Sequence, residues 1–220
     1  MSAIGIDFGN YSSYVALVRT GGIDTVDNDY SYRATPTAVA FTNLLRFTGN
    51  SAKIQAVTNY RNTFCSFKNL IGLMYDEPRA QLEMSLIPSN FIKLDDGTIG
   101  VEATYLNQPC QFSITQLTAM MLSELKKTTL RHVSAMTATV LSVPSFFTEI
   151  QRRYFLDACD IAGLVNFNII NDTAAVCLNY ILFKTDLPAD NKVPRYVAFV
   201  DVGYSSTQIC IASFTKSKVR

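Results

Sequence analysis

The chain has 220 residues, 17% of them charged, and a formal net charge of +1, so its length allows one large domain or two small ones. Because the lysines and arginines are scattered and nearly balanced by acids, neither nucleic acid nor an anionic membrane is expected as a partner. No stretch approaches the roughly 20 apolar residues that span a bilayer, and the chain begins in a predicted strand without a basic and apolar leader. We therefore expect a soluble cytoplasmic protein.

Five cysteines are spread along the chain, at Cys65, Cys110, Cys159, Cys177 and Cys210. Their number is odd and no two form a Cys-x-x-Cys pair, so we expect reduced, mostly buried thiols rather than a disulfide framework or a zinc site. The single histidine, His132, falls at the end of a predicted helix, where a surface or capping role is expected. Because the sequence offers no Ser-His-Asp set, it does not favour hydrolysis through a catalytic triad.

Strands are predicted first along the chain. Residues 3–8, 13–18 and 22–26 are apolar runs separated by turn residues, which indicates two or three antiparallel strands. Residues 34–41 form a further extended run, because the residue before Pro36 is pushed out of the helical region.

The middle of the chain predicts a smaller inserted α+β unit. Short helices are expected at residues 51–58 and 63–71. Short strands are expected at residues 91–94, 97–101 and 108–112. The tripeptide Asp95-Asp96-Gly97 predicts a hairpin turn between the first two of these strands.

The remainder predicts an α/β plan. Ser113 caps an amphipathic helix that reaches about residue 130, with apolar side chains at helical spacing. Strands at residues 137–143 and 166–170 then alternate with helices at 148–162 and 173–183, and a strand pair follows at 196–201 and 207–214. Because the strand runs at residues 137–143 and 166–170 are continuously apolar, a sheet buried on both faces is expected for them.

Two segments repeat one pattern. Asp7-Phe8-Gly9 and Asp201-Val202-Gly203 each end an apolar run, and each precedes small polar residues and a second apolar run. A hairpin of this kind has a carboxylate at the end of its first strand and a glycine in its turn. The glycine lets backbone N–H groups approach an anion, and the carboxylate can hold a cation through water. The repeat therefore suggests a duplicated fold that grips one charged ligand, most naturally a nucleotide phosphate with its metal.

Each feature also has a simpler interpretation. An aspartate in a hairpin turn can be an ordinary turn residue, and a lone lysine such as Lys68 on an amphipathic helix is usually solvated. Asp172, where a strand meets a helix, can be a simple N-cap, although such junctions in α/β folds also bind anions and place a general base. The tripeptide Asp7-Phe8-Gly9 spells a kinase metal motif, but no upstream glycine loop or strand lysine accompanies it.

Seven segments carry a resemblance to heat-shock chaperone ATPase domains of the actin-like superfamily, and they extend over the whole chain. They are IGIDFGNYSS, RATPTAVAF, RFTGNSAKIQ, NTFCSFKNLIGL, VLSVPSFFTEIQRR, INDTAAVCLNYILF and FVDVGYSSTQI. The last two, with residues 184–188, resemble the 110-kDa heat-shock branch more than the 70-kDa branch. The resemblance implies an α/β fold of the actin-like, ribonuclease H-like class.

The resemblance further implies that the chain is an N-terminal part of such a domain. Residues 1–40 and 113–190 would form the core of a first lobe, and residues 41–112 a smaller inserted subdomain. Residues 191–220 would be the first hairpin of a second lobe.

The resemblance also assigns roles to residues. Phosphate-binding positions fall on Gly9, Asn10, Tyr11, Gly203, Tyr204, Ser205 and Ser206. Catalytic positions fall on Lys68, Asp172 and Asp201, and the carboxylates that hold Mg²⁺ through water match Asp7 and Asp201. Pro144 and Arg152 match the proline and arginine that relay nucleotide state to the substrate domain in the 70-kDa family.

Several positions depart from the 70-kDa pattern. Asn10 and Tyr11 replace threonines, and the second turn carries Tyr204 and Ser205 where that family has glycines, which hinders close approach of backbone N–H groups to a phosphate. Asp172 replaces a glutamate, and the missing methylene can shift a water that it positions by about 1 Å, at a cost on the order of 100-fold in rate. We expect an ATP site that holds nucleotide but hydrolyses it poorly.

The 110-kDa branch implies a co-chaperone. Its cofactors would be ATP or ADP with Mg²⁺, and its partner a 70-kDa heat-shock chaperone from which it releases ADP as a nucleotide exchange factor. Unfolded polypeptides would bind through C-terminal domains that this chain lacks. Two alternatives remain open: an active 70-kDa-type chaperone ATPase, and an isolated lobe fragment without nucleotide binding or activity, because the second lobe holds most of the adenine and ribose in this fold.

Overall fold

The computed structural model describes residues 2–19 and 21–219, and the chain divides into two compact units. Unit 1 consists of the described residues of Met1–Leu141 and Phe147–Asn168, and unit 2 of those of Ser142–Phe146 and Ile169–Arg220. The division into residues 1–40 with 113–190, 41–112 and 191–220 remains a prediction.

The main sheet begins with the predicted antiparallel strands. They are β1 (Ser2–Asp7), β2 (Ser12–Arg19) and β3 (Gly22–Thr25). Two later strands, β11 (Met136–Val143) and β12 (Phe167–Asn171), extend the order to β12-β11-β1-β2-β3, and β4 (Thr35–Pro36) pairs with β2. Along β2, Val15 and Leu17 are buried while their neighbours are not, because successive side chains of a strand point to opposite faces.

Two small three-stranded sheets follow in unit 1. The first has the order β6-β5-β7, with β5 at Ala38–Phe41, β6 at Arg46–Thr48 and β7 at Thr63–Cys65. The second has the order β10-β9-β8, with β8 at Phe91–Lys93, β9 at Ile99–Tyr105 and β10 at Gln108–Ser113. The short helices here are α1 (Gly49–Ile54), α2 (Pro78–Ser85) and the 3₁₀ turns η1 (Tyr60–Asn62) and η2 (Lys68–Leu70). The Asp95-Asp96-Gly97 turn joins β8 to β9, as predicted, with Gly97 at φ 80°.

The helix predicted at residues 63–71 is wrong. Thr63–Cys65 is strand β7, in which Phe64 pairs with Val39 and is 1% exposed. Ser66 then adopts φ 57°, a left-handed conformation that a right-handed helix does not contain. Only the short turn η2 remains helical, so long-range pairing overrides the local helical spacing.

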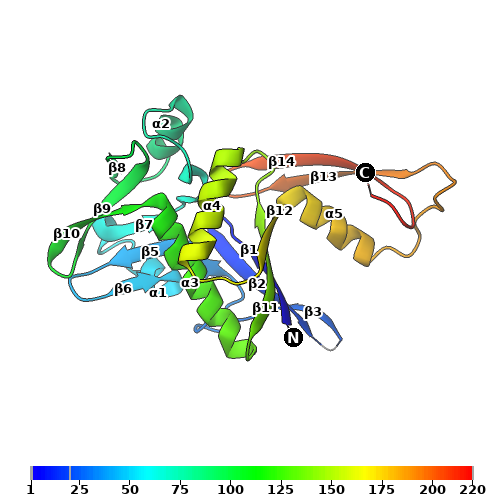
Figure 1. Cartoon of the computed structure of the whole chain (residues 1–220), viewed down its shortest axis with the longest axis horizontal. Helices are drawn as coiled ribbons and strands as arrows, with labels where there is room; N and C mark the ends of the chain where they lie inside the picture. Colours follow the sequence, from blue (N-terminus) through cyan, green and yellow to red (C-terminus); the bar gives the residue numbers. More distant parts are fainter. Residues whose placement is uncertain (1, 20, 220) are drawn as a thin grey trace. The chain divides into compact units, whose positions relative to one another are not determined.

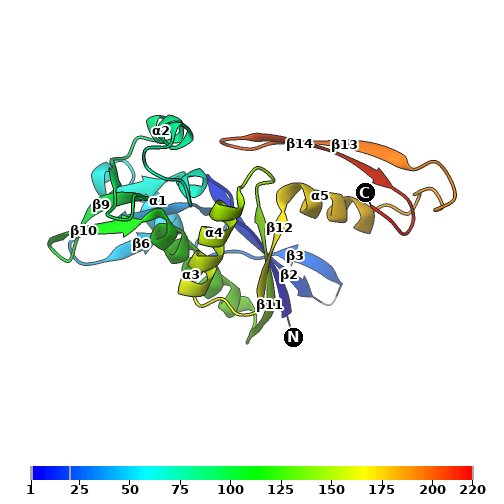
Figure 2. The ribbon, with the colours of Figure 1, turned by 45° about the horizontal axis from the view of Figure 1, so that its top comes forward.

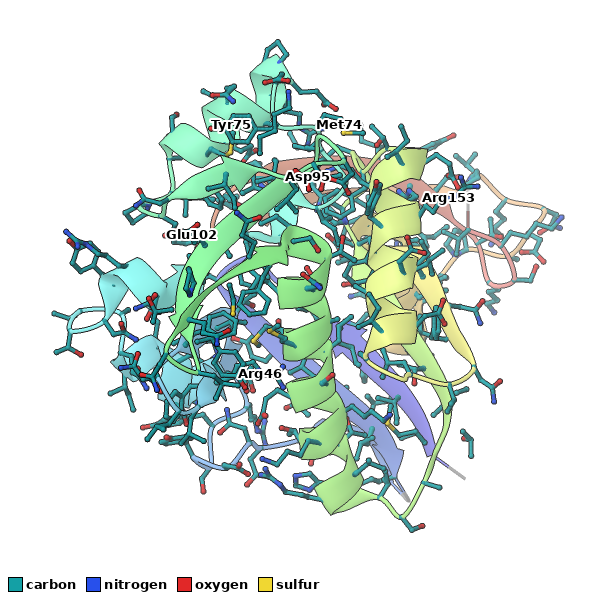
Figure 3. The ribbon with its side chains drawn as sticks, turned by 60° about the vertical axis from the view of Figure 1, so that its left-hand side comes forward. Arg46, Met74, Tyr75, Asp95, Glu102 and Arg153 are labelled. Carbon is teal, nitrogen blue, oxygen red and sulfur yellow. The ribbon has the colours of Figure 1, made fainter. Side chains whose placement is uncertain are left out.

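Two long helices lie side by side in unit 1 (Figure 3). They are α3 (Ile114–His132), which also crosses one face of β2 (Figure 1), and α4 (Glu149–Ile161). Each begins with a capping box, in which Ser113 or Thr148 accepts a hydrogen bond from the backbone N–H three residues on. The predicted starts of both helices are confirmed. Arg153 projects from α4 on the side away from α3 (Figure 3).

Unit 2 is a helix packed on a hairpin. Helix α5 (Asp172–Leu182) lies along β13 (Arg195–Val202) and β14 (Thr207–Phe214), as Figures 1 and 2 show. The rings of Tyr180 on α5 and Phe214 on β14 have centroids 4.9 Å apart, and Phe199 completes the cluster.

The hairpin of unit 2 is buried on one face only. Because α5 covers one face, the other leaves Val200 and Ile211 exposed within the chain. The same alternation occurs on β11, where Leu141 is buried and Val140 is exposed, so the predicted burial of residues 137–143 on both faces is wrong. All five cysteines are free thiols, but only Cys159 and Cys177 are buried, so the expectation of mostly buried thiols is wrong. Within residues 2–19 and 21–219, no helix is long and apolar enough to cross a membrane.

Candidate functional site

The first Asp-x-Gly turn lies in unit 1 and requires a glycine. Strand β1 ends at Asp7, which pairs with Tyr14 of β2. A Cβ atom added at Gly9 would lie 2.1 Å from the backbone oxygen of Ser12, a distance that no side chain tolerates. The tightness of the turn, rather than a left-handed φ, therefore excludes every other residue at position 9.

A buried threonine holds this turn. The Thr37 hydroxyl donates to the backbone oxygen of Gly9 at 2.8 Å, and the Thr37 N–H donates to that of Tyr11 at 2.9 Å. The Ser13 hydroxyl lies 3.0 Å from the Thr37 hydroxyl. Sequence reasoning missed Thr37; the available signal was a polar residue in the predicted extended run of residues 34–41. The turn is thus fixed by a residue outside its own hairpin.

The structure brings Asn10 and Lys68 together. The Asn10 side-chain oxygen accepts a hydrogen bond from the Lys68 backbone N–H at 2.9 Å, and Lys68 is only 5% exposed. The simpler interpretation of Lys68 as a solvated lysine on a helix is therefore wrong. Tyr11 faces a different cation, since the Lys53 ammonium lies 5.0 Å from the centre of its ring.

The segment after Lys68 is held against the start of α4. The Gln151 side-chain amide donates to the backbone oxygen of Asn69 at 3.3 Å. Gly72 has φ 68°, and a Cβ there would lie 2.8 Å from the Cα of Gln151. The backbone therefore contacts α4 closely at Gly72, a few residues after Lys68.

The second Asp-x-Gly turn lies in unit 2 and has a similar local geometry. The Gly203 N–H donates to the backbone oxygen of Ser206 at 2.9 Å, and a Cβ on Gly203 would lie 3.2 Å from that oxygen. In both turns, then, a glycine lies against the carbonyl three residues later. Tyr204 and Ser205 form the tip, and Tyr204 is 67% exposed. Strand pairing sets Asp201 opposite Gln208.

Asp172 is the first residue of α5, not its N-cap. The N-cap is Asn171, whose side chain makes no capping hydrogen bond, so the simple capping interpretation of Asp172 is wrong. One carboxylate oxygen, Oδ2, accepts from the Gln208 side-chain amide at 3.1 Å. The other, Oδ1, is buried without a hydrogen-bond partner among the described residues. An acidic residue also suits this position because the helix N-terminus carries partial positive charge.

The predicted relay residues fall in different units. Arg152 belongs to unit 1, where its Nε donates to the backbone oxygen of Phe147 at 3.1 Å. Pro144 belongs to the short segment Ser142–Phe146 of unit 2. Their role remains a prediction.

The other predicted site residues divide between the units. Unit 1 contains Asp7, Gly9, Asn10, Tyr11 and Lys68, and unit 2 contains Asp172, Asp201, Gly203, Tyr204, Ser205 and Ser206. Among the residues that the structure describes, no three His, Cys, Asp or Glu side chains gather in a metal-binding group. Burial, with a contribution from the neighbouring Cys210, raises the pKa of the Cys177 thiol in unit 2.

Comparison with known proteins assigns the chain to a family. The family model described as "Hsp70 protein" matches residues 3–220. The 97 kDa heat shock protein of Strongylocentrotus purpuratus is 40% identical over 221 residues, and Heat shock 70 kDa protein 4L of Homo sapiens is 41% identical over 221 residues. Heat shock protein 110 of Caenorhabditis elegans is 40% identical over 223 residues.

Each alignment covers 100% of this chain but only 25%, 26% and 29%, respectively, of the relative. The chain therefore spans about a quarter of the length of these relatives. The mixed α/β fold agrees with the actin-like ATPase fold expected for this family. The match over nearly the whole sequence leads to one conclusion: the chain belongs to the Hsp70 protein family.

Proposed function

We propose that the chain is the N-terminal, nucleotide-binding part of a molecular chaperone of the 110-kDa heat-shock type. In this proposal the full-length protein binds ATP or ADP with Mg²⁺, supports at most slow hydrolysis and serves nucleotide exchange on a 70-kDa heat-shock chaperone, whereas the 220-residue chain alone is inactive as an ATPase. Unfolded polypeptides would bind to parts of the protein outside this chain. We propose the cytoplasm as its compartment, since free thiols persist in reducing surroundings.

The observation that carries nucleotide binding is the turn at Gly9. Gly9 has no side chain, and any side chain there would collide with the backbone oxygen of Ser12. The Thr37 hydroxyl holds the Gly9 backbone in place by donating a hydrogen bond to its carbonyl oxygen. A rigid turn of bare backbone next to a carboxylate suits a phosphate and its cation. Lys68, whose backbone is tied to the same turn through Asn10, would supply positive charge.

Unit 2 offers a second set of fitting residues. The buried oxygen Oδ1 of Asp172 is an acceptor without a donor among the described residues, which suits a bound water. We propose that Asp7 holds Mg²⁺ through water, and we propose the same role for Asp201. When bound, the metal would neutralise phosphate charge.

Slow hydrolysis follows from the side chains present. Tyr204 and Ser205 occupy the tip of the second turn, where bare backbone would approach a phosphate most closely. Asp172 is one methylene shorter than a glutamate, so a water on Oδ1 would lie differently from one held by the longer side chain. Both features are expected to slow hydrolysis.

The similarity to Heat shock protein 110 and the 97 kDa heat shock protein supports the 110-kDa branch. The similarity to Heat shock 70 kDa protein 4L is of the same degree, and the name of that relative leaves the active 70-kDa-type ATPase as the second candidate.

Calorimetry of the 220-residue chain with MgATP tests nucleotide binding. We expect a micromolar Kd that Asp7→Asn weakens about tenfold, because loss of one carboxylate near the metal should cost about 1.4 kcal/mol of binding free energy. Asp24→Asn, on the exposed strand β3, is the matched control and should leave the Kd unchanged. Absence of binding at millimolar MgATP would support the isolated-fragment alternative.

The exchange role is tested with the natural full-length protein. Release of fluorescent ADP from a 70-kDa heat-shock chaperone should accelerate at least tenfold when that protein is added with ATP. If the protein instead turns over ATP at the rate of the 70-kDa chaperone and does not accelerate release, the second candidate replaces the proposal.

A further inference from the structure

The side chain of Gln208 joins two distant segments of unit 2. It lies on β14 and is only 7% exposed. Its oxygen accepts from both the backbone N–H and the hydroxyl of Ser145, each at 2.8 Å. Its amide nitrogen donates to Oδ2 of Asp172 at 3.1 Å. One buried amide thus links Ser145, which lies 63 positions away in the sequence, to Asp172, which lies 36 positions away.

The partners of Gln208 determine which way its amide points. The backbone N–H of Ser145 can only donate, so it requires the carbonyl oxygen of Gln208. The NH₂ group must then face Asp172, whose carboxylate can accept it. A glutamate at position 208 would satisfy Ser145 but offer Asp172 a second carboxylate instead of a donor. Glutamine therefore suits both contacts.

The second oxygen of Asp172 remains to be satisfied. With Oδ2 tied to Gln208, Oδ1 is buried and has no hydrogen-bond partner among the described residues. Buried polar atoms in folded proteins are almost always hydrogen-bonded, either to protein or to ordered water. An acceptor in this position calls for a donor, and water is the smallest group that supplies one.

The elements that carry the two side chains are packed together. Tyr180 on α5 contacts Phe199 and Phe214 of the hairpin, with ring centroids 5.6 and 4.9 Å apart. Cys177 and Ala212 are buried in the same cluster. Because α5 carries Asp172 and β14 carries Gln208, this packing limits how far the carboxylate and the amide can separate.

We infer that Gln208 is a positioning residue for Asp172: it holds Oδ2 so that Oδ1 accepts a hydrogen bond from a water molecule. The inference rests on the proposed ATP-binding function: the water would form a bond to the terminal phosphorus of ATP, the bond from that phosphorus to the bridging oxygen would break so that ADP leaves, and one proton of the water would pass to Oδ1 of Asp172. Ser145 follows Pro144 directly, so the same amide also couples the Ser142–Phe146 segment to the Asp172 carboxylate.

Nuclear magnetic resonance of the 220-residue chain tests the contact itself. In Asp172→Asn, the side-chain NH₂ resonances of Gln208 should shift, whereas Asp160→Asn on α4 of unit 1 is the matched control and should leave them in place. In Gln208→Leu, hydrogen exchange at the Ser145 amide should accelerate at least tenfold, since its acceptor is lost. Unchanged Gln208 resonances in Asp172→Asn would overturn the inference whether or not the chain binds ATP.

Single-turnover ATP hydrolysis by the natural full-length protein tests the role. Gln208→Leu should lower the rate at saturating MgATP by about 10- to 100-fold, the scale expected for misplacing a reacting group by about 1 Å. The Kd for MgATP should stay within threefold, because a residue that only supports the fold would alter binding and rate together. Gln81→Leu, at an exposed glutamine on α2 that donates to a backbone oxygen, is the matched control.

The outcomes separate the two proposals. If the wild-type protein binds no MgATP, the proposed function fails and this role fails with it. If the wild type binds and hydrolyses ATP while Gln208→Leu retains its rate within twofold, only the positioning role is overturned. Ser145→Ala keeps the backbone donor to Gln208, so a rate within about threefold of wild type is expected there.

Discussion

The amide oxygen of Asn10 accepts a hydrogen bond from the backbone N–H of Lys68 at 2.9 Å, across 58 residues of sequence. This contact joins the turn after β1 to the 3₁₀ turn η2 in unit 1. The side chain that departs from the threonine of the 70-kDa pattern therefore takes a structural part: it positions the segment that carries the lysine.

Removing this acceptor should loosen the lysine segment. Asn10→Ala leaves the buried Lys68 N–H without this partner, and we expect a loss of about 1–2 kcal/mol in the free energy of unfolding, measured by urea denaturation. Asn10→Asp keeps an oxygen in place and should lose less than half of that. Equal losses in the two variants would show that the side-chain oxygen is not what stabilises the segment.

Gly9 should be the least replaceable glycine among those of the described strands and turns. Gly9→Ala places a Cβ 2.1 Å from the Ser12 carbonyl oxygen, so the turn must open, and we expect a loss of about 3 kcal/mol. Gly5 on β1 has no atom within 4 Å of such a Cβ, so Gly5→Ala is the control and should be neutral or stabilise the chain by about 0.5 kcal/mol. Thermal unfolding of both variants measures the difference, and a Gly9→Ala variant as stable as Gly5→Ala would contradict the tight geometry of this turn.

Alkaline stability should depend on Cys159. Burial on α4, with a contribution from Asp160, raises the pKa of the Cys159 thiol to about 12. In the unfolded chain this thiol ionises near its ordinary pKa of about 8.5, so the unfolded state loses its proton first. The free energy of unfolding should therefore fall by about 1.4 kcal/mol per pH unit above that pKa, until the folded thiol also ionises.

The comparison with Cys159→Ala isolates this contribution. Other groups titrate in the same range in both proteins, so the difference in slope between pH 9 and about 11 belongs to Cys159. Urea denaturation at several pH values supplies the slopes. Parallel slopes in the two proteins would show that the thiol ionises equally in both states.

Replacing Ser217 should remove a hydrogen bond that lowers the pKa of Asp190 in unit 2. The Ser217 hydroxyl and backbone N–H both donate to this carboxylate, at 2.5 and 3.2 Å, and they help to lower its pKa to about 2. Because the folded pKa lies below the unfolded one, the contact stabilises the chain at neutral pH, and its contribution is lost as the pH falls from about 4 to about 2. Ser217→Ala should move the pKa of Asp190 toward the ordinary value, as read from its carboxyl resonance during titration. Ser205→Ala is the control, and a Ser217→Ala titration that matches it would exclude the hydroxyl as the cause.

Local features of the sequence predicted local structure well. The starts of α3 and α4 follow from Ser113 and Thr148, whose hydroxyls meet a backbone N–H three residues on, and the pairing of β13 with β14 follows from two apolar runs around a glycine turn. The prediction of a helix over Phe64 is wrong because the apolar spacing there suits a helix and a buried strand alike. The pairing of Phe64 with Val39 stabilises the strand.

The sequence by itself determined the class of fold, the two Asp-x-Gly turns and the family resemblance, because each depends on residues that lie close together in the chain. Only the tertiary structure decided which distant side chains hold the candidate site residues in place. Thr37 bonds to Gly9, Asn10 to Lys68, and Gln208 to Asp172. These contacts cross 28, 58 and 36 residues, and no local periodicity encodes such a pairing. Hydrogen bonds between buried groups form only where packing brings a donor to an acceptor, so they follow from the fold as a whole.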